Sequence, residues 1–294
     1  MRLEYYSGTE AFGNDVLEPL LRHEEQNNLL ISFARNDRKA ETSGWLLATV
    51  KDNAGSVLLT AACTPPFNLV LAETDNRPCP AAVKLLASEL KTMRRMFPGV
   101  LAEQTLARRF AEEFAGTGRY RINHSMTVMR LDRVANHTPS PGAARPLREE
   151  DLFFVPYWSR AFAEEAHVEQ PGLDASIEQT RKRIGADTFY LWEDRIPVSQ
   201  ACHARSTMHG AAISAVYTPP PYRGRGYASS LVAELSRVLL ERGNRFCCLF
   251  ADTANPVSCG IYRRIGTSTG ASSKNCSGSS DQKPRNTVRS SPGR

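Results

Sequence analysis

The sequence lacks any apolar run long enough to cross a membrane, and no apolar signal-peptide core follows its first residues. Cysteine is scarce and unpatterned: none of the seven cysteines forms a Cys-x-x-Cys pair. The six histidines show no spacing typical of metal ligands. These absences argue against a membrane protein, a secreted domain stabilised by disulfide bonds and a zinc protein. We therefore expect a cytoplasmic protein that binds no metal.

A basic face for nucleic acid is also missing. The formal net charge is +6, but five basic residues and a single acidic one fall within the last 28 residues, 267–294. The rest of the chain is close to neutral for its size, so its charge does not indicate a folded surface for phosphate backbones. We expect neither a nucleic-acid partner nor a membrane partner. A nucleic-acid binder acting through the basic tail stays open as a weaker hypothesis.

What the sequence does contain is a glycine- and arginine-rich turn between a strand and a helix. The apolar run 211–217 predicts a strand, and apolar residues at steps of three and four from Ala228 to Leu239 predict a helix. Between them lies the turn Arg223-Gly224-Arg225-Gly226-Tyr227-Ala228. The first N–H groups of a helix have no internal partners, and glycines allow a ligand to approach closely. The pattern therefore predicts a phosphate site at the helix N-terminus.

Neither common nucleotide motif fits this turn. No Gly-Lys-Ser/Thr ends it, and the third glycine of a dinucleotide fingerprint would fall on Ser229. A second motif begins at Asn255 and includes Tyr262. It follows the apolar run 246–251, which is typical of a buried parallel strand. Taken alone, Asn255 has a helix N-cap before proline as its structural alternative, and Tyr262 an amphipathic core aromatic.

Together the two motifs resemble those of the GNAT superfamily of N-acetyltransferases. Arg223-x-x-Gly226-x-Ala228 resembles the family's acyl-coenzyme A (acyl-CoA) pyrophosphate loop. The pattern N-x-x-S-x-x-x-Y-x-x-x-G, beginning at Asn255, resembles the family's helix beside the pantetheine arm. The resemblance implies acetyl-CoA as co-substrate and transfer of its acetyl group to a primary amine of a small molecule or peptide. A non-catalytic protein that binds or senses acyl-CoA is the alternative.

The resemblance also implies roles for individual residues. In the family a strand edge pairs with the pantetheine amides, and the tyrosine that matches Tyr262 is the candidate acid for the departing thiolate. The matching cofactor-binding residues are Val216, Tyr217, Thr218, Arg223, Gly224, Arg225, Gly226, Tyr227, Ala228 and Asn255. The general base is open between a chain of waters and the side chains of Glu164, Glu165, His167 and Glu193. A solvated surface charge is the alternative for each of these four. The sequence identifies neither the acceptor nor the oligomeric state.

The chain divides into two halves of similar order, in a tandem arrangement. We expect an α/β protein of two GNAT-like units, each with a mixed, mostly antiparallel central sheet flanked by helices. The predicted boundaries are 1–134 for a degenerate first unit, 135–143 for a linker, 144–266 for the acyl-CoA-binding unit and 267–294 for a tail. The first unit has Glu73-Thr74-Asp75-Asn76-Arg77-Pro78 in place of the glycine turn. We therefore expect the first unit not to bind pyrophosphate.

The second unit ends abnormally. The family follows Tyr-x-x-x-Gly with an aromatic residue and two further strands, but Thr267 occupies that place. Only Ala271, Cys276 and Val288 are apolar from there to the end, too few for a strand with a buried face. We therefore expect a disordered tail, a C-terminal unit without its usual last strands, and impaired activity. A native disordered segment and an out-of-frame ending both stay open as explanations.

Overall fold

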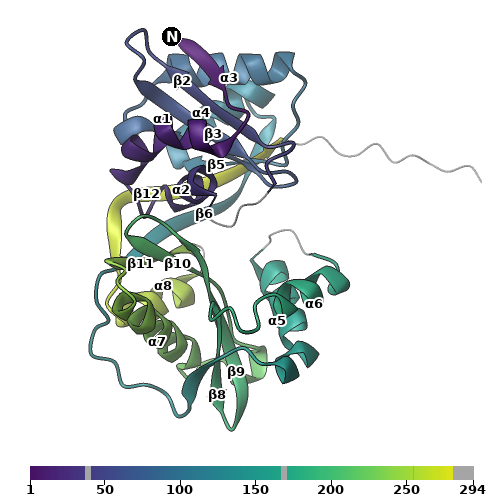
Figure 1. Cartoon of the computed structure of the whole chain (residues 1–294), viewed down its shortest axis with the longest axis vertical. Coiled ribbons are helices and arrows are strands. Elements are labelled where there is room, and N and C mark those ends of the chain that lie inside the picture. Colours follow the sequence, from purple (N-terminus) through teal and green to yellow (C-terminus); the bar gives the residue numbers. More distant parts are fainter. Residues whose placement is uncertain (37–40, 167–170, 254, 281–294) are drawn as a thin grey trace, which may run out of the picture.

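The computed structural model describes residues 1–36, 41–166, 171–253 and 255–280 (Figure 1). The N-terminal unit contains β1 (Arg2–Tyr5), α1 (Thr9–Leu21), α2 (Asn28–Arg35), β2 (Leu46–Lys51), β3 (Val57–Cys63), β4 (Leu69–Glu73), α3 (Pro80–Thr92), β5 (Val100–Glu103), α4 (Gln104–Ala115) and β6 (Tyr120–Leu131). The C-terminal unit contains β7 (Ala143–Pro146), α5 (Val155–Glu165), α6 (Leu173–Arg181), β8 (Phe189–Asp194), β9 (Ile196–Ser206), β10 (Gly210–Tyr217), α7 (Tyr227–Glu241), β11 (Phe246–Asp252), α8 (Pro256–Arg264) and β12 (Ser268–Ser280).

All the described strands join one twelve-stranded sheet, in the order β1-β2-β3-β4-β5-β12-β6-β11-β10-β9-β8-β7. Among these strands, only β4 with β5 and β10 with β11 pair in parallel. Each unit thus has antiparallel hairpins, then one parallel pair whose connection is a helix, α3 or α7. The predicted α/β class, with mixed and mostly antiparallel sheets flanked by helices, is confirmed. The two half-sheets are continuous with each other.

The core of the C-terminal unit follows directly from the sequence periodicities. Helix α7 buries Leu231 and Leu239 on one face, as its spacing of three and four predicts. Successive residues of β8 alternate between the two faces of the sheet: Trp192 joins the cluster under α7, and Leu191 joins the cluster under α5. Figure 1 shows α7 and α8 on one side of these strands and α5 and α6 on the other. The strands are therefore buried on both faces.

The two units exchange their last strands. β6, which ends the N-terminal unit, pairs with β11 of the C-terminal unit. β12, which ends the C-terminal unit, lies between β5 and β6 and pairs antiparallel with both. Neither unit therefore carries a complete sheet by itself. The domain boundaries drawn from the sequence stay a prediction, and a chain divided at the linker would separate strands that pair with each other.

Strand β12 corrects the prediction for the tail. No strand was expected after Gly266, yet residues 268–280 form one; residues 281–294 lie outside the described part of the chain. The physical reason is that a strand between two others is held by main-chain hydrogen bonds on both sides, which polar and small residues supply as well as apolar ones. Side-chain composition alone therefore gave the wrong answer here.

We expect a chain that ends at Gly266 to be less stable than one that ends at Ser280, which keeps every described strand. Removing β12 leaves facing edges of β5 and β6 unpaired, and each lost main-chain hydrogen bond costs about 0.5–1.5 kcal/mol. The melting temperature should fall by at least about 5 °C. Circular dichroism melts of the two chains measure the difference. Equal melting temperatures would mean that β12 contributes no stability.

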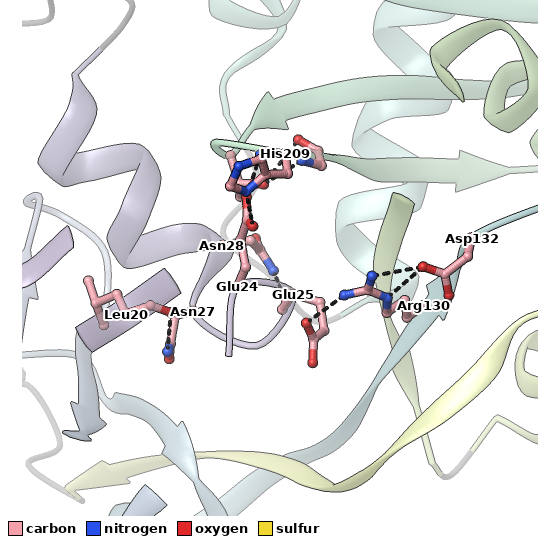
Figure 2. Close-up of polar contacts among 10 residues, drawn as sticks. Leu20, Glu24, Glu25, Asn27, Asn28, Arg130, Asp132 and His209 are labelled. Carbon is pink, nitrogen blue, oxygen red and sulfur yellow. Dashed lines mark hydrogen bonds and ion pairs between the residues drawn. The ribbon is translucent and has the colours of Figure 1, made fainter. Parts of the chain in front are cut away.

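A polar contact between the units fixes their relative position (Figure 2). The buried Glu24, in the loop between α1 and α2, accepts a hydrogen bond from the main-chain N–H of His209 at 2.6 Å, and its other oxygen lies 2.9 Å from Nδ1 of the same residue. Burial opposes the charge, but hydrogen bonds from Thr207 and His209 outweigh it and lower the pKa of Glu24. Nearby, Arg130 of β6 binds Glu25 at 3.2 Å. The Glu24 carboxylate of the N-terminal unit is therefore bonded by a residue of the C-terminal unit, while the Arg130–Glu25 pair lies within the N-terminal unit.

The described residues contain no helix long and apolar enough to span a membrane. They also contain no group of His, Cys, Asp or Glu side chains arranged to hold a metal ion. Cys247, Cys248 and Cys259 are free and buried, as expected for small apolar side chains.

Candidate functional site

The parallel strands β10 and β11 pair over only three residues and then diverge. Gly210 to Ala212 lie opposite Phe246 to Cys248, and within the described strands the pairing stops there. The later residues of β10 remain bonded to β9, and those of β11 to β6. The facing edges beyond Ala212 therefore carry main-chain N–H and C=O groups without a strand partner, which is what a ligand with amide groups needs.

A β-bulge shapes the β10 edge of this groove. Ser214 lies opposite Cys202 and Tyr217 opposite Gln200, so two residues, Ala215 and Val216, face a single residue of β9. Ala215 has a φ of 53°, a left-handed conformation that costs free energy for a residue with a side chain. The bulge releases the main chain at Val216 from the β9 ladder and makes it available to the groove.

The end of β10 is held to the glycine turn by side chains. The Ser199 hydroxyl donates to the main-chain oxygen of Tyr217 at 3.1 Å and lies 2.8 Å from the hydroxyl of Thr218. Nε of Arg223 donates to the main-chain oxygen of Thr218 at 2.8 Å, and its guanidinium lies 5.6 Å from the ring centre of Tyr217. Burial raises the pKa of Tyr217. The predicted strand-edge residues and the predicted phosphate loop are therefore brought together.

The turn presents an uncapped helix N-terminus. Residues 223–226 are exposed, and Gly224 and Gly226 have φ values of 77° and 80°, which glycine adopts at low cost. Gly226 is the N-cap of α7 and has no side chain to bond the first N–H groups of the helix. The uncapped helix N-terminus, preceded by the exposed turn that carries Arg223 and Arg225, fits the expected phosphate site.

The structure adds a steric reason for one of the two glycines. A Cβ atom on Gly226 would lie 2.7 Å from Oγ of Ser140, so this position is glycine because of its backbone conformation and of the linker that packs on it. A Cβ on Gly224 would meet no atom within 4 Å. Ser140 also donates to the main-chain oxygen of Arg225 at 2.8 Å. The segment between the units therefore forms part of the loop's support.

Tyr227 and Ala228 can serve a ligand only through their main chain or their position. The Tyr227 side chain is buried and donates its hydroxyl to Asp194 at 2.6 Å; this hydrogen bond raises the pKa of Tyr227. Ala228 is half-buried in the first turn of α7. Both residues belong to the predicted set, but Tyr227 is anchored to the end of β8 rather than turned to the loop.

The candidate general bases differ in their ion pairs and in their exposure to solvent. Glu165, at the end of α5, makes a two-pronged ion pair with Arg223 at 2.7 and 2.9 Å, although both side chains are about half exposed. Glu193 is bound by Arg145, which also pairs with the fully buried Asp151. Glu164 is exposed, and His167 lies outside the described residues. Glu193 is thus held in an ion pair with Arg145. Glu165 pairs with the guanidinium of Arg223, which is one of the residues expected to bind phosphate.

Tyr262 lies on helix α8, and Asn255 immediately precedes that helix. Helix α8 packs against β11 and α7, and Tyr262 is buried there in the cluster that also contains Leu231 and Cys259. Asn255 is exposed, and its main-chain oxygen accepts the N–H of Cys259 at 3.3 Å, which places it at the start of the helix. The structural alternatives stay open for both residues, and their roles toward acetyl-CoA stay a prediction.

Sequence reasoning missed Gln200. This side chain is fully buried on β9 opposite the bulge, and its Nε2 donates a long hydrogen bond of 3.5 Å to the main-chain oxygen of Ala215. Its Oε1 has no hydrogen-bond partner among the described residues. A buried acceptor left unpaired costs about 1–3 kcal/mol, so it marks a place where a donor is expected. The available signal was a glutamine within the apolar strand run 197–202.

In the N-terminal unit, a carboxylate occupies the position that corresponds to the predicted phosphate site of the C-terminal unit. The carboxylate of Glu73 accepts the main-chain N–H of Cys79 at 2.7 Å, and Cys79 is the N-cap of α3. Helix α3 corresponds to α7, because each connects the parallel pair of its unit. An internal carboxylate therefore stands where a phosphate would bind, which supports the expectation that the loop from Glu73 to Pro78 is degenerate.

Comparisons with known proteins identify chains with a similar fold. A family model described as "FR47-like protein" matches residues 195–274, and no curated protein matches the sequence. A GCN5-related N-acetyltransferase from Sphaerobacter thermophilus is 17% identical, with 94% of each chain covered and a TM-score of 0.64. A tandem GNAT protein from the clavulanic acid biosynthesis pathway is 14% identical over 94% of this chain and 97% of its own, with a TM-score of 0.54.

The chain has the tandem GNAT fold. A GNAT-family acetyltransferase from Colwellia psychrerythraea supports this over its whole length: it is 9% identical, 95% of this chain and 99% of that chain are covered, and the TM-score is 0.58. The predicted resemblance to the superfamily is confirmed. At such identities the likeness concerns fold, so the activity of this chain has to be argued from its own residues.

Proposed function

We propose that this tandem GNAT protein is an N-acetyltransferase that moves an acetyl group from acetyl-CoA to a primary amine. One observation carries the proposal: a single unit combines the diverging strands β10 and β11, the bulge at Ala215 and the uncapped N-terminus of α7. The first two offer unpaired main-chain groups to a pantetheine arm, and the third offers N–H groups to a pyrophosphate.

Binding and positioning fall to the loop and the strand edge. Arg223, Arg225 and the first N–H groups of α7 supply positive charge and donors for the pyrophosphate. Val216 and Thr218 supply main-chain groups for the pantetheine amides. Because a developing oxyanion is stabilised best by donors that are already fixed, a main-chain N–H at the bulge is the donor we assign to it. Orientation of this kind contributes up to roughly 7–11 kcal/mol in favourable cases.

The chemical step is a direct transfer. The amine nitrogen forms a bond to the thioester carbonyl carbon, the C–S bond breaks, the amine loses a proton and the thiolate gains one. Tyr262 is the residue we assign as the donor of that last proton. Burial raises the pKa of Cys247 and Cys248 to about 12, so both are neutral thiols near pH 7 and poor nucleophiles. A cysteine-bound acetyl intermediate is therefore not part of the proposal.

The non-catalytic alternative has lost its main support. It rested on a C-terminal unit without final strands, and β12 pairs with strands on both of its sides. Tyr262, which a sensor would not need, lies on the helix beside the groove strand β11.

A turnover screen tests the proposed function. The full chain is incubated with acetyl-CoA and a panel of amines, polyamines, amino acids and peptides, and released thiol and acetylated product are both measured. We expect one class of amine to give stoichiometric thiol and product. Saturable CoA binding with no amine-dependent thiol release from any acceptor class would instead identify a binding protein.

A further inference from the structure

A cavity of about 260 Å³ lies in the N-terminal unit, where β4 and β5 diverge. These strands pair in parallel only at Leu69 and Val70, just as β10 and β11 pair only at their starts. The cavity is therefore the N-terminal counterpart of the acyl-CoA groove, and it is a separate site. One wall, Phe250, comes from β11 of the C-terminal unit.

The lining has two chemically different parts. One part of the lining is apolar and includes Leu30, Leu101, Leu106 and Phe250. Its polar part includes two carboxylates, Glu73 and Glu103, together with the neutral groups of Gln26, Asn27 and Asn76. Asn76 and Pro78 are exposed, so they mark the mouth. Such a lining fits a small ligand with an apolar body and a positively charged end.

Glu73 is the group that favours a positively charged ligand. Its side chain is only 7% exposed, and both of its contacts use Oε1: the N–H of Cys79 at 2.7 Å and Nη1 of Arg109 at 3.3 Å. Among the described residues, none donates a hydrogen bond to Oε2. Burial raises the pKa of Glu73, and the charge of Glu103 adds to the effect. The carboxylate is thus held where its charge is poorly solvated, and a cation at Oε2 would relieve that cost.

The same features exclude a second molecule of acetyl-CoA. Glu73 already occupies the N-terminus of α3, and its carboxylate and that of Glu103 repel a pyrophosphate. The volume is also below the roughly 300–1,000 Å³ of sites for drug-sized ligands.

We infer that this cavity binds a small amphipathic monoamine, with its ammonium group on Oε2 of Glu73 and its apolar body against Leu101, Leu106 and Phe250. The inference goes beyond the proposed acyl transfer, because binding is measured with no thioester present. It gives the degenerate N-terminal unit a ligand of its own.

The test is calorimetry on the full chain, with 2-phenylethylamine and a series of aliphatic monoamines as probes. The neutral analogue 2-phenylethanol is the ligand control. The variant is Glu73→Gln, whose amide oxygen still accepts the N–H of Cys79 but whose charge is gone. We expect at least about tenfold weaker amine binding, since a hydrogen bond between charged groups is lost. Glu113→Gln, an exposed carboxylate on α4, is the matched control and should bind amines like the original chain.

A stability measurement separates this role from a purely structural one. Because burial disfavours the charge of Glu73, the neutral Glu73→Gln chain should melt no lower than the original chain near pH 7. Ala72→Leu, which fills the cavity from β4, is a second variant that should weaken amine binding without changing the carboxylate. Unchanged binding in both variants, equal binding of 2-phenylethanol, or no saturable binding of any probe amine would overturn the inference.

Discussion

Replacing Tyr262 with phenylalanine is expected to lower turnover by ~10²–10⁴-fold while leaving CoA affinity almost unchanged. A proton donor that acts on the departing thiolate contributes in the transition state and little in the ground state. Because Tyr262 is buried beside β11, phenylalanine keeps its packing and removes only the hydroxyl. Steady-state kinetics gives the first quantity, and calorimetry with CoA gives the second.

Tyr227 supplies the matched control for this experiment. It is buried in the same cluster as Tyr262, but its hydroxyl bonds Asp194. Tyr227→Phe should therefore cost some stability and change turnover by less than the effect expected at Tyr262. A drop below about threefold for Tyr262→Phe would assign the proton to water or to another group.

The double variant Arg223→Gln and Arg225→Gln is expected to weaken CoA binding by at least about 100-fold. Each arginine can supply a charge-assisted hydrogen bond to the pyrophosphate, typically worth about 1.5–3 kcal/mol. Binding of S-acetylpantetheine, which has no pyrophosphate, should be unaffected. Calorimetry with the two ligands measures both effects.

Two single variants test the same CoA-binding site further. Glu165→Gln should move CoA affinity the other way, about two- to fivefold tighter, because it frees Arg223 from an exposed ion pair worth only about 0.2–1 kcal/mol. Arg237→Gln removes an exposed arginine further along α7 and should leave affinity unchanged. If the loop double variant binds CoA as the original chain does, the pyrophosphate site lies elsewhere.

Local signals were sufficient for much of the candidate site. The turn from Arg223 to Ala228 was predicted because a strand, a glycine turn and a helix N-terminus are consecutive in the chain, so their geometry is set by neighbouring residues. The burial of Leu231 and Leu239 followed from a helical period for the same reason. The absence of closely spaced glycines at Glu73 to Pro78 likewise predicted a degenerate loop.

Contacts between distant segments were not predictable in this way. Ser140 lies 85 residues before Arg225, and its packing on Gly226 leaves no room there for a side chain. Glu165 lies 58 residues before Arg223, and the sequence did not indicate that the two would form an ion pair. Nothing in the sequence around Gln200 indicated that its buried oxygen would be left without a partner. Each of these facts depends on packing of elements whose order in space is not their order in the chain.

The sequence by itself determined the tandem α/β units and the glycine turn before helix α7, because periodicity and turn chemistry act between near neighbours. Only the tertiary structure decided that the units exchange β6 and β12, that residues 268–280 form a strand, and that a carboxylate-lined cavity lies between β4 and β5. The physical reason is that strand pairing and cavity formation depend on main-chain hydrogen bonds and burial between residues far apart in the chain, and polar side chains do not prevent either.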